Sequence, residues 1–219
     1  MSTVYGIYGA SGFGKEVLPL VKEQFGSVAR IVFVDDGDVP NELLGCDILN
    51  FEQFLNLEGQ KKVTIAIANS KIREKLTLKC LENSFEIFDL KSSNSVVLDG
   101  VKMGAGSILC PFVTLTSDIT IGKSFQANIY SYVAHDCVIG DYVTFAPAVK
   151  CNGNVHIGDH AYIGTGAIIH QGKSNKPLKI GKGAVIAAGA VVTKSVPDGM
   201  TVFGSPAIEF TKENIKRRS

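Results

Sequence analysis

A histidine followed directly by an aspartate, His135 and Asp136, is the pair in this chain best suited to proton transfer. An unperturbed imidazole titrates near pH 6.5, so a small change of environment makes it an effective base at neutral pH. His135 lies between two apolar positions, Val133 and Cys137, that should point into a core, so its own ring should point outward. The residue types indicate a candidate general base, and they leave an ordinary surface histidine open as the alternative.

A glycine-rich segment near the N-terminus is a candidate phosphate-binding loop. The apolar run Val4–Tyr8 ends in Gly9-Ala-Ser-Gly-Phe-Gly14, and a helix-like stretch follows. Backbone amides at such a turn from strand to helix can hold a phosphate group. The glycine spacing is GxxGxG, whereas nicotinamide-binding loops have GxGxxG, so a nicotinamide cofactor is not favoured.

Two carboxylates end the second apolar run of the chain. Asp35 and Asp36 follow Ile31–Val34 directly. A carboxylate at the end of such a strand can accept hydrogen bonds from ribose hydroxyls or from the N–H of a base. The alternative is a turn that simply ends the strand.

Short β-branched runs alternate with helix-like segments in the first part of the chain. Ile31–Val34 and Val63–Ala68 should be strands, and Ile72–Glu82 should be a helix. This alternation predicts a parallel sheet of the βαβ type. The segment is too short for a complete two-lobed dinucleotide fold. We therefore predict a shortened Rossmann-like α/β domain over residues 1–90.

The remainder of the chain follows a period of six residues. Every sixth residue is apolar over thirteen positions: Val97, Met103, Leu109, Leu115, Ile121, Ala127, Val133, Ile139, Phe145, Cys151, Ile157, Ile163 and Ile169. Three such hexads make one triangular coil, so residues 18 apart should stack on one another. We predict an all-β left-handed parallel β-helix over residues 91–219, with a C-terminal tail and an outward loop at Gln171–Lys179. Another six-residue β-solenoid is the alternative.

Composition excludes several classes of partner. The net charge is +1 and the basic residues are spread thinly, which argues against nucleic acid or an anionic membrane as a partner. No apolar run approaches the roughly 18 residues that would cross a bilayer, and the first residues carry no basic start or cleavage signal. We therefore expect a cytoplasmic protein. The five cysteines form no CxxC pair, so we expect reduced thiols and no metal site.

Several motifs together resemble the bacterial nucleotide-sugar N-acetyltransferases of the hexapeptide-repeat superfamily. They include the glycine-rich loop, the two aspartates, HDCVIGD from His135 to Asp141, Gly153-Asn-Val155 and Gly204-Ser-Pro-Ala207. The chain is similar to the enzymes that acetylate UDP-4-amino sugars on the way to bacillosamine, and to sialic acid O-acetyltransferases. The resemblance implies a homotrimer in which the N-terminal domain holds a UDP-sugar. Acetyl-CoA would lie between neighbouring solenoids, with active sites at subunit interfaces.

The resemblance also implies roles for single residues. The family's catalytic histidine aligns with His135, and the acidic residue that orients it aligns with Asp136. The implied nucleotide-sugar contacts are Gly9, Ser11, Gly12, Phe13, Gly14, Asp35, Asp36, Asn69, Arg73 and Asn128. The implied acetyl-CoA contacts are Thr144, Gly153, Ile163, Gly164, Ala188 and Gly189. Relatives often carry a second histidine where this chain has Thr144, so the contact there is in question.

We predict an acetyl-CoA-dependent N-acetyltransferase that acts on the 4-amino group of a UDP-linked 4-amino-4,6-dideoxy sugar. A thioester is already activated, so the reaction needs a base, oxyanion donors and positioning, but no nucleophilic side chain. The nearest alternative is O-acetylation of a sialic-acid-like sugar. A non-catalytic solenoid scaffold is a rival that the His135–Asp136 pair opposes. A nicotinamide-dependent oxidoreductase would need a longer N-terminal domain.

Overall fold

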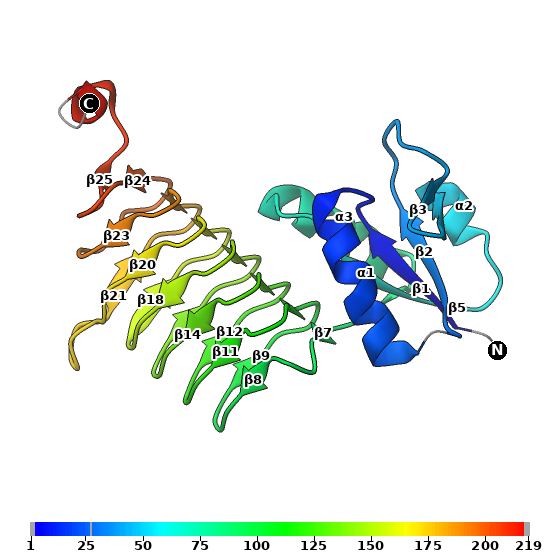
Figure 1. Ribbon diagram of the computed structural model, residues 1–219, viewed down its shortest axis with the longest axis horizontal. Helices are drawn as coiled ribbons and strands as arrows, with labels where there is room; N and C mark the ends of the chain where they lie inside the picture. The colour runs from blue at the N-terminus through cyan, green and yellow to red at the C-terminus, as the bar shows by residue number, and fades with distance from the viewer. Residues whose placement is uncertain (1–2, 27, 217–219) are drawn as a thin grey trace.

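The computed structural model describes residues 3–26 and 28–216, which form a small α/β unit followed by a long stack of coils (Figure 1). The α/β unit holds one six-stranded sheet in the order β3-β4-β2-β1-β5-β6. Its strands are β1 (Thr3–Tyr8), β2 (Arg30–Val34), β3 (Glu42–Leu43), β4 (Cys46–Leu49), β5 (Gln60–Ile65) and β6 (Glu86–Ile87). Its helices are α1 (Gly12–Phe25), α2 (Phe51–Leu55) and α3 (Ser70–Glu82). Neighbouring strands are parallel except β3 and β4, as the βαβ alternation predicts.

The core of this unit is made by the central strands and one face of α1. Val4 and Ile7 of β1 and Val63 of β5 are fully buried, as a parallel sheet covered on both sides requires. The apolar face of α1 presents Val17 and Val21, which belong to one continuous core with the first coils of the solenoid. The two parts of the chain are therefore packed together and share a core.

The solenoid has three flat faces, each a parallel sheet with one short strand from every coil (Figure 1). The first face runs β7 (Leu90–Lys91), β10 (Ile108–Leu109), β13 (Gln126–Ala127), β16 (Thr144–Phe145), β19 (Tyr162–Ile163), β22 (Val185–Ile186) and β24 (Thr201–Phe203), with β25 (Ile208–Glu209) antiparallel at its edge. The second face runs β8 (Val96–Val97), β11 (Thr114–Leu115), β14 (Tyr132–Val133), β17 (Lys150–Cys151), β20 (Ile168–Ile169) and β23 (Val191–Val192). The third face runs β9 (Lys102–Met103), β12 (Thr120–Ile121), β15 (Val138–Ile139), β18 (Val155–Ile157) and β21 (Leu178–Ile180). The predicted left-handed β-helix is confirmed.

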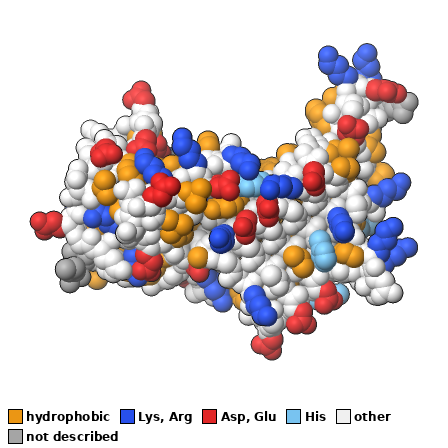
Figure 2. Space-filling model, turned by 180° about the vertical axis from the view of Figure 1, so that it is seen from behind, with side chains coloured by type: hydrophobic (Ala, Val, Ile, Leu, Met, Phe, Trp, Pro, Cys, Tyr) orange, Lys and Arg blue, Asp and Glu red, His pale blue; other side chains and the backbone are white. Residues whose placement is uncertain are grey.

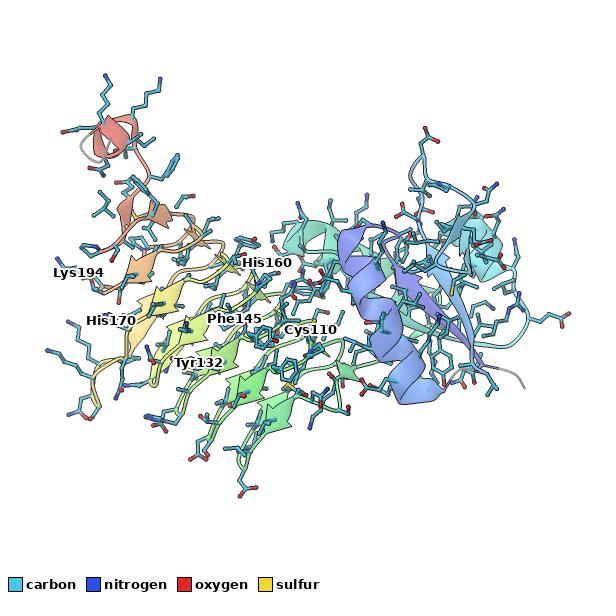
Figure 3. The ribbon with its side chains drawn as sticks, in the orientation of Figure 1. Cys110, Tyr132, Phe145, His160, His170 and Lys194 are labelled. Atoms are coloured by element: carbon cyan, nitrogen blue, oxygen red, sulfur yellow. The ribbon has the colours of Figure 1, made fainter. Side chains whose placement is uncertain are left out.

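The six-residue apolar period fills the interior of the coils. Phe145, for example, is 1% exposed and meets Phe125 edge to face at 5.2 Å between ring centroids (Figure 3). Met103 is an exception, with 37% of its surface exposed. It belongs to β9, the end strand of the third face, so no coil lies below it to complete its burial.

Between faces the chain turns at corners, and one residue of each corner adopts a left-handed backbone. We call the corner between the first and second faces the first corner, that between the second and third faces the second corner, and that between the third and first faces the third corner. The left-handed residues that are not glycine have φ between 52° and 64°: Phe112, Tyr130 and Ala148 at the first corner, Asp118, Asp136 and Asn154 at the second, and Ser124, Tyr142 and His160 at the third. Each column repeats every 18 residues, because every coil turns in the same way.

The polar segment after β20 leaves the stack as a short hairpin. Lys173 and Lys176 pair through their backbones at 2.9 and 2.8 Å. The Asn154 side chain donates to the Lys173 carbonyl at 2.5 Å, and the Gly172 N–H donates to the Gly153 carbonyl at 3.0 Å. These bonds attach the hairpin to the second corner.

The last described element after the coils is α4 (Lys212–Lys216), which stands apart from the stack (Figure 1). Within the described part of the chain, no helix has both the length and the apolar character needed to cross a membrane.

Candidate active site

His135 and Asp136 lie together on the second corner, between β14 and β15. The His135 Nδ1 is 2.7 Å from the Asp136 Oδ2, and the two side chains are 53% and 61% exposed. A carboxylate accepts and does not donate, so Nδ1 carries the proton in the neutral imidazole. The lone pair of Nε2 then faces away from Asp136 and is available to accept a proton. Asp136 has a left-handed backbone with φ of 59°, as the other residues of its corner column do.

Gly153 lies one coil further along, against the His135 ring. A Cβ built on Gly153 would be 2.6 Å from both Cε1 and Nε2 of His135, so a side chain at this position would have to displace the ring. The next residue, Asn154, donates its N–H to the His135 carbonyl at 2.8 Å. Within residues 3–26 and 28–216, the Gly153 N–H itself has no backbone acceptor. The second corner therefore places Gly153, whose N–H has no backbone acceptor among the described residues, against the side of the ring that carries Nε2.

The glycine-rich loop joins β1 to α1 as the sequence predicts. Gly9 has φ of 112°, and a Cβ on Gly14 would lie 2.1 Å from the Gly9 carbonyl oxygen, so both glycines are needed for the tight turn. A Cβ on Gly12 would meet nothing within 4 Å. Ser11 is the N-cap of α1, and its side chain makes no capping hydrogen bond. The start of α1 thus presents open space and backbone amides.

The two aspartates at the end of β2 are bonded to the protein. Asp35 accepts from the Ala10 N–H at 2.8 Å and from the Gly37 N–H at 3.0 Å, which fixes the glycine-rich loop from the side. Asp36 accepts from the Tyr8 hydroxyl at 2.5 Å and from the Phe51 N–H at 2.8 Å.

Burial tends to raise the pKa of Asp36, but these hydrogen bonds, with one from Lys79, hold the pKa below its ordinary value. Burial and the bonded carboxylate also raise the pKa of Tyr8. Asp35 therefore stabilises the glycine-rich loop, and Asp36 links the end of β1 to the start of α2.

A cavity of about 300 Å³ separates the start of α1 from the solenoid. Gly12 and Phe13 line one side, and Asn128 and Thr144 line the other. Four residues predicted from the resemblance therefore meet at one cavity. Several further lining residues were not predicted from the sequence: Glu16, Ala68, Gln126, Tyr162 and Thr165. Their types carry no signal in the sequence, because only the docking of α1 on the first face brings them together.

Arg73 requires a correction, because the structure does not allow it to contact a nucleotide. It is fully buried between α3 and the solenoid. It donates to the carbonyls of Ser124 at 3.1 Å and Tyr142 at 2.6 Å, and to the Thr144 hydroxyl at 3.0 Å. Its remaining bonds go to Ile67, Ala68, Val143 and Gln126. Burial lowers its pKa to about 10, so it stays charged at neutral pH. Arg73 joins the two parts of the chain.

Asn69 and Thr144 also lie where α3 packs against the solenoid. Asn69 caps α3, accepting from the Lys71 and Ile72 N–H groups at 3.1 Å each. Thr144, only 6% exposed, also donates to the Ala68 carbonyl at 3.2 Å. At the neighbouring third corner, His160 stacks on Tyr142 with 5.4 Å between ring centroids and lies near α3 (Figure 3).

Replacing Arg73 with alanine should destabilise the protein strongly. Seven oxygen acceptors lose the donor that Arg73 provides, and the carbonyls of Ala68 and Val143 keep a second donor. A buried acceptor left without a donor costs about 1–3 kcal/mol, so the loss of several donors at once should cost about 3 kcal/mol or more. Urea unfolding should show the loss, whereas Lys75→Ala on an exposed position of the same helix should change stability by less than about 0.5 kcal/mol. Equal stability of the two variants would contradict the structural role.

The predicted acetyl-CoA contacts separate into two groups. Gly153 is on the second corner, whereas Gly164, Ala188 and Gly189 lie on the first corner, across the second face. Ile163 requires a correction, because its side chain is fully buried in the core and cannot touch a ligand. Ala188 and Gly189 are exposed.

On the face shown in Figure 2, acidic and basic side chains are interspersed, and the net charge of the chain is +1.

Comparison with known proteins agrees with this architecture. The family model of the PglD N-terminal domain matches residues 6–80. The chain is 50% identical over 214 residues to GDP-perosamine N-acetyltransferase of Escherichia coli O157:H7, covering 95% of this chain and 97% of that protein.

Two solved structures are similar over nearly the whole chain. WeeI from Acinetobacter baumannii AYE has a TM-score of 0.94 and 57% identity, covering 95% of this chain and all of that chain. The acetyltransferase domain of PglB from Neisseria gonorrhoeae FA1090, in complex with acetyl coenzyme A, has a TM-score of 0.86 and 28% identity, covering 96% of this chain and all of that chain.

Fold, corner geometry and these similarities together define an acyltransferase built on hexapeptide repeats. The chain belongs to the nucleotide-sugar N-acetyltransferases of this superfamily.

Proposed function

We propose that the protein transfers the acetyl group of acetyl-CoA to the 4-amino group of a GDP-linked 4-amino-4,6-dideoxy sugar. The observation that carries the chemistry is the second corner, where His135 Nδ1 is 2.7 Å from Asp136 and Gly153 faces the ring. The GDP carrier is favoured over the UDP carrier of the sequence analysis because the relative with 50% identity is named for GDP-perosamine. Acetyl-CoA is favoured because the PglB domain was solved with it.

The reaction follows from the geometry of the corner. The sugar amine attacks the thioester carbonyl while Nε2 of His135 accepts its proton. Asp136 stabilises the imidazolium that forms, through the hydrogen bond to Nδ1. The free N–H of Gly153 donates to the oxyanion of the tetrahedral intermediate. The carbon–sulfur bond then breaks, and the CoA thiolate takes the proton from His135.

We further propose that each active site is shared between two copies of the chain. The cavity at the start of α1 opens on the first face and the first corner, whereas His135 is on the second corner. Asn128 and His135 lie on different corners, at opposite edges of the second face, which favours a sugar that is contacted by two copies of the chain. A cyclic trimer that sets the first corner of one solenoid against the second corner of the next would complete the site.

An acceptor panel tests this function. The protein is given acetyl-CoA with GDP- and UDP-linked 4-amino-4,6-dideoxy sugars and with their 4-hydroxy counterparts, and thiol release is followed. We expect kcat/KM to be highest for the GDP-linked amine, because an amine is an easier nucleophile for a single histidine base. A higher kcat/KM for the UDP-linked amine would contradict the GDP carrier and support the UDP carrier that was predicted from the sequence. Equal transfer to a hydroxyl sugar would contradict N-acetylation.

A further inference from the structure

The charge along the second corner changes sign at the coil that carries His135. Asp99 and Asp118 lie on the coils before it, and both are exposed. The hairpin lysines Lys173 and Lys176 lie two coils beyond it, and Lys194 lies three coils beyond it. Figure 3 shows Lys194 on the coil next to the one that carries His170.

The three lysines line one hollow. A cavity of about 500 Å³ lies between the hairpin and the following corner, and Thr193 and Ser195 complete its polar lining. No Asp or Glu is among its lining residues. Over the described ranges, none of the three ammonium groups has a carboxylate within 4.0 Å. Three uncompensated positive charges around a hollow attract a group with several negative charges.

The hollow is held at a fixed distance from the catalytic corner. Asn154, the residue after Gly153, bonds the Lys173 carbonyl at 2.5 Å and also accepts from the Leu178 N–H at 3.2 Å. Parallel strands are stacked about 4.8 Å apart, so two to three coils place the lysines about 10–14 Å from His135.

We propose that this hollow, the lysine pocket, binds the phosphate groups of the acyl-CoA donor. This inference rests on the proposed function. About thirteen bonds join the thioester sulfur of CoA to its first phosphorus, which corresponds to about 15 Å when extended at roughly 3.5 Å per three bonds. A thioester at His135 therefore reaches the lysine pocket with its phosphates. In the opposite direction the same phosphates would meet Asp99 and Asp118, so the charge of the corner fixes which way the donor lies.

The proposal extends the donor site beyond the residues that the resemblance implies. Ala188 and Gly189 are on the first corner, and in a shared site they belong to the copy facing the lysine pocket. The donor would then lie between small exposed residues of one copy and lysines of the other. Lys173, Lys176 and Lys194 act as binding residues, remote from the reacting atoms.

Two donors separate phosphate binding from catalysis. Acetyl-CoA carries the phosphates, and S-acetylpantetheine carries the same thioester without any phosphate. We expect the triple variant Lys173→Ala/Lys176→Ala/Lys194→Ala to lower kcat/KM for acetyl-CoA about tenfold, mainly through KM. With S-acetylpantetheine the variant should match the unmodified protein. The corresponding triple arginine variant should keep the affinity for acetyl-CoA.

A second triple variant controls for net charge. Lys22→Ala/Lys75→Ala/Lys91→Ala removes three exposed lysines elsewhere and should leave both donors unaffected. An unchanged KM for acetyl-CoA in the lysine-pocket variant, with an active unmodified protein, would overturn this inference alone. Equal losses with both donors, or a raised KM for the nucleotide sugar instead, would also overturn it. Absence of transfer from acetyl-CoA by the unmodified protein would overturn the proposed function and this inference together.

Discussion

His135→Ala is expected to lower kcat by about 10²- to 10⁴-fold, the range typical for loss of a general base. In the proposed mechanism the imidazole accepts the proton of the amine, and its Nδ1 is held by Asp136 at 2.7 Å. The side chain is 53% exposed, so its removal opens no cavity and the fold should persist. Steady-state kinetics with an unchanged thermal melting curve is the measurement. Near-normal turnover would mean that solvent or another group takes the proton.

His135→Ala, combined with a second variant, Gly12→Trp, tests whether the active site is shared between copies of the chain. Gly12→Trp should fill the cavity at the start of α1 without disturbing the fold, since a Cβ there meets nothing within 4 Å. Each variant alone should be inactive or nearly so. The His135→Ala chain and the Gly12→Trp chain are then co-expressed and assemble at random. About a quarter of the shared sites should pair an intact His135 from one copy with an intact Gly12 from the neighbouring copy. Recovery of that activity supports the shared site. If one chain supplied both residues, every site would remain defective.

Gly153→Ala is expected to lower kcat by about 10²-fold or more, although it adds only one methyl group. The new Cβ would lie 2.6 Å from two atoms of the His135 ring, so the ring must move away from Asp136 and from the attacking nitrogen. The loss should appear in kcat with both amine acceptors, because the geometry of the base is altered and substrate binding is not.

A glycine elsewhere in the solenoid gives the matched control. Gly183 is at the third corner with φ of 64°, and a Cβ there meets nothing within 4 Å. His160 occupies the same place one coil earlier with φ of 61°, so the solenoid accepts a side chain at this position. Gly183→Ala should therefore keep normal turnover. If Gly153→Ala were equally active, Gly153 would not constrain the His135 ring.

The six-residue period predicts much of this site because it determines which side chains point outward and which residues stack on one another in successive coils. Each apolar position defines which neighbours point outward, so the exposure of His135 follows from Val133 and Cys137. The 18-residue coil similarly predicts that Gly153 stacks on His135, and the structure has it there. The role of Asn69 as a helix cap was also accessible, since asparagine before a helix is a common cap.

Other features depend on docking between distant segments, which no local pattern records. An arginine on a helix is normally expected to face solvent, yet Arg73 is buried because its acceptors are carbonyls on coils about 50 to 70 positions later. The partnership of Asp36 with Tyr8 likewise depends on how β1 and β2 pair. The proposed meeting of the first and second corners in one active site depends on contacts between copies, which no pattern within one chain records.

The uniform coil also has an evolutionary consequence. Each coil repeats the same three turns, so duplication of one 18-residue unit would insert a layer without changing the layers on either side. An extra layer between His135 and Lys194 would lengthen their separation by about 4.8 Å and leave both local environments intact. Gene duplication within such a stack thus offers a stepwise way to match the spacing between a catalytic group and a distant anchor to substrates of different length.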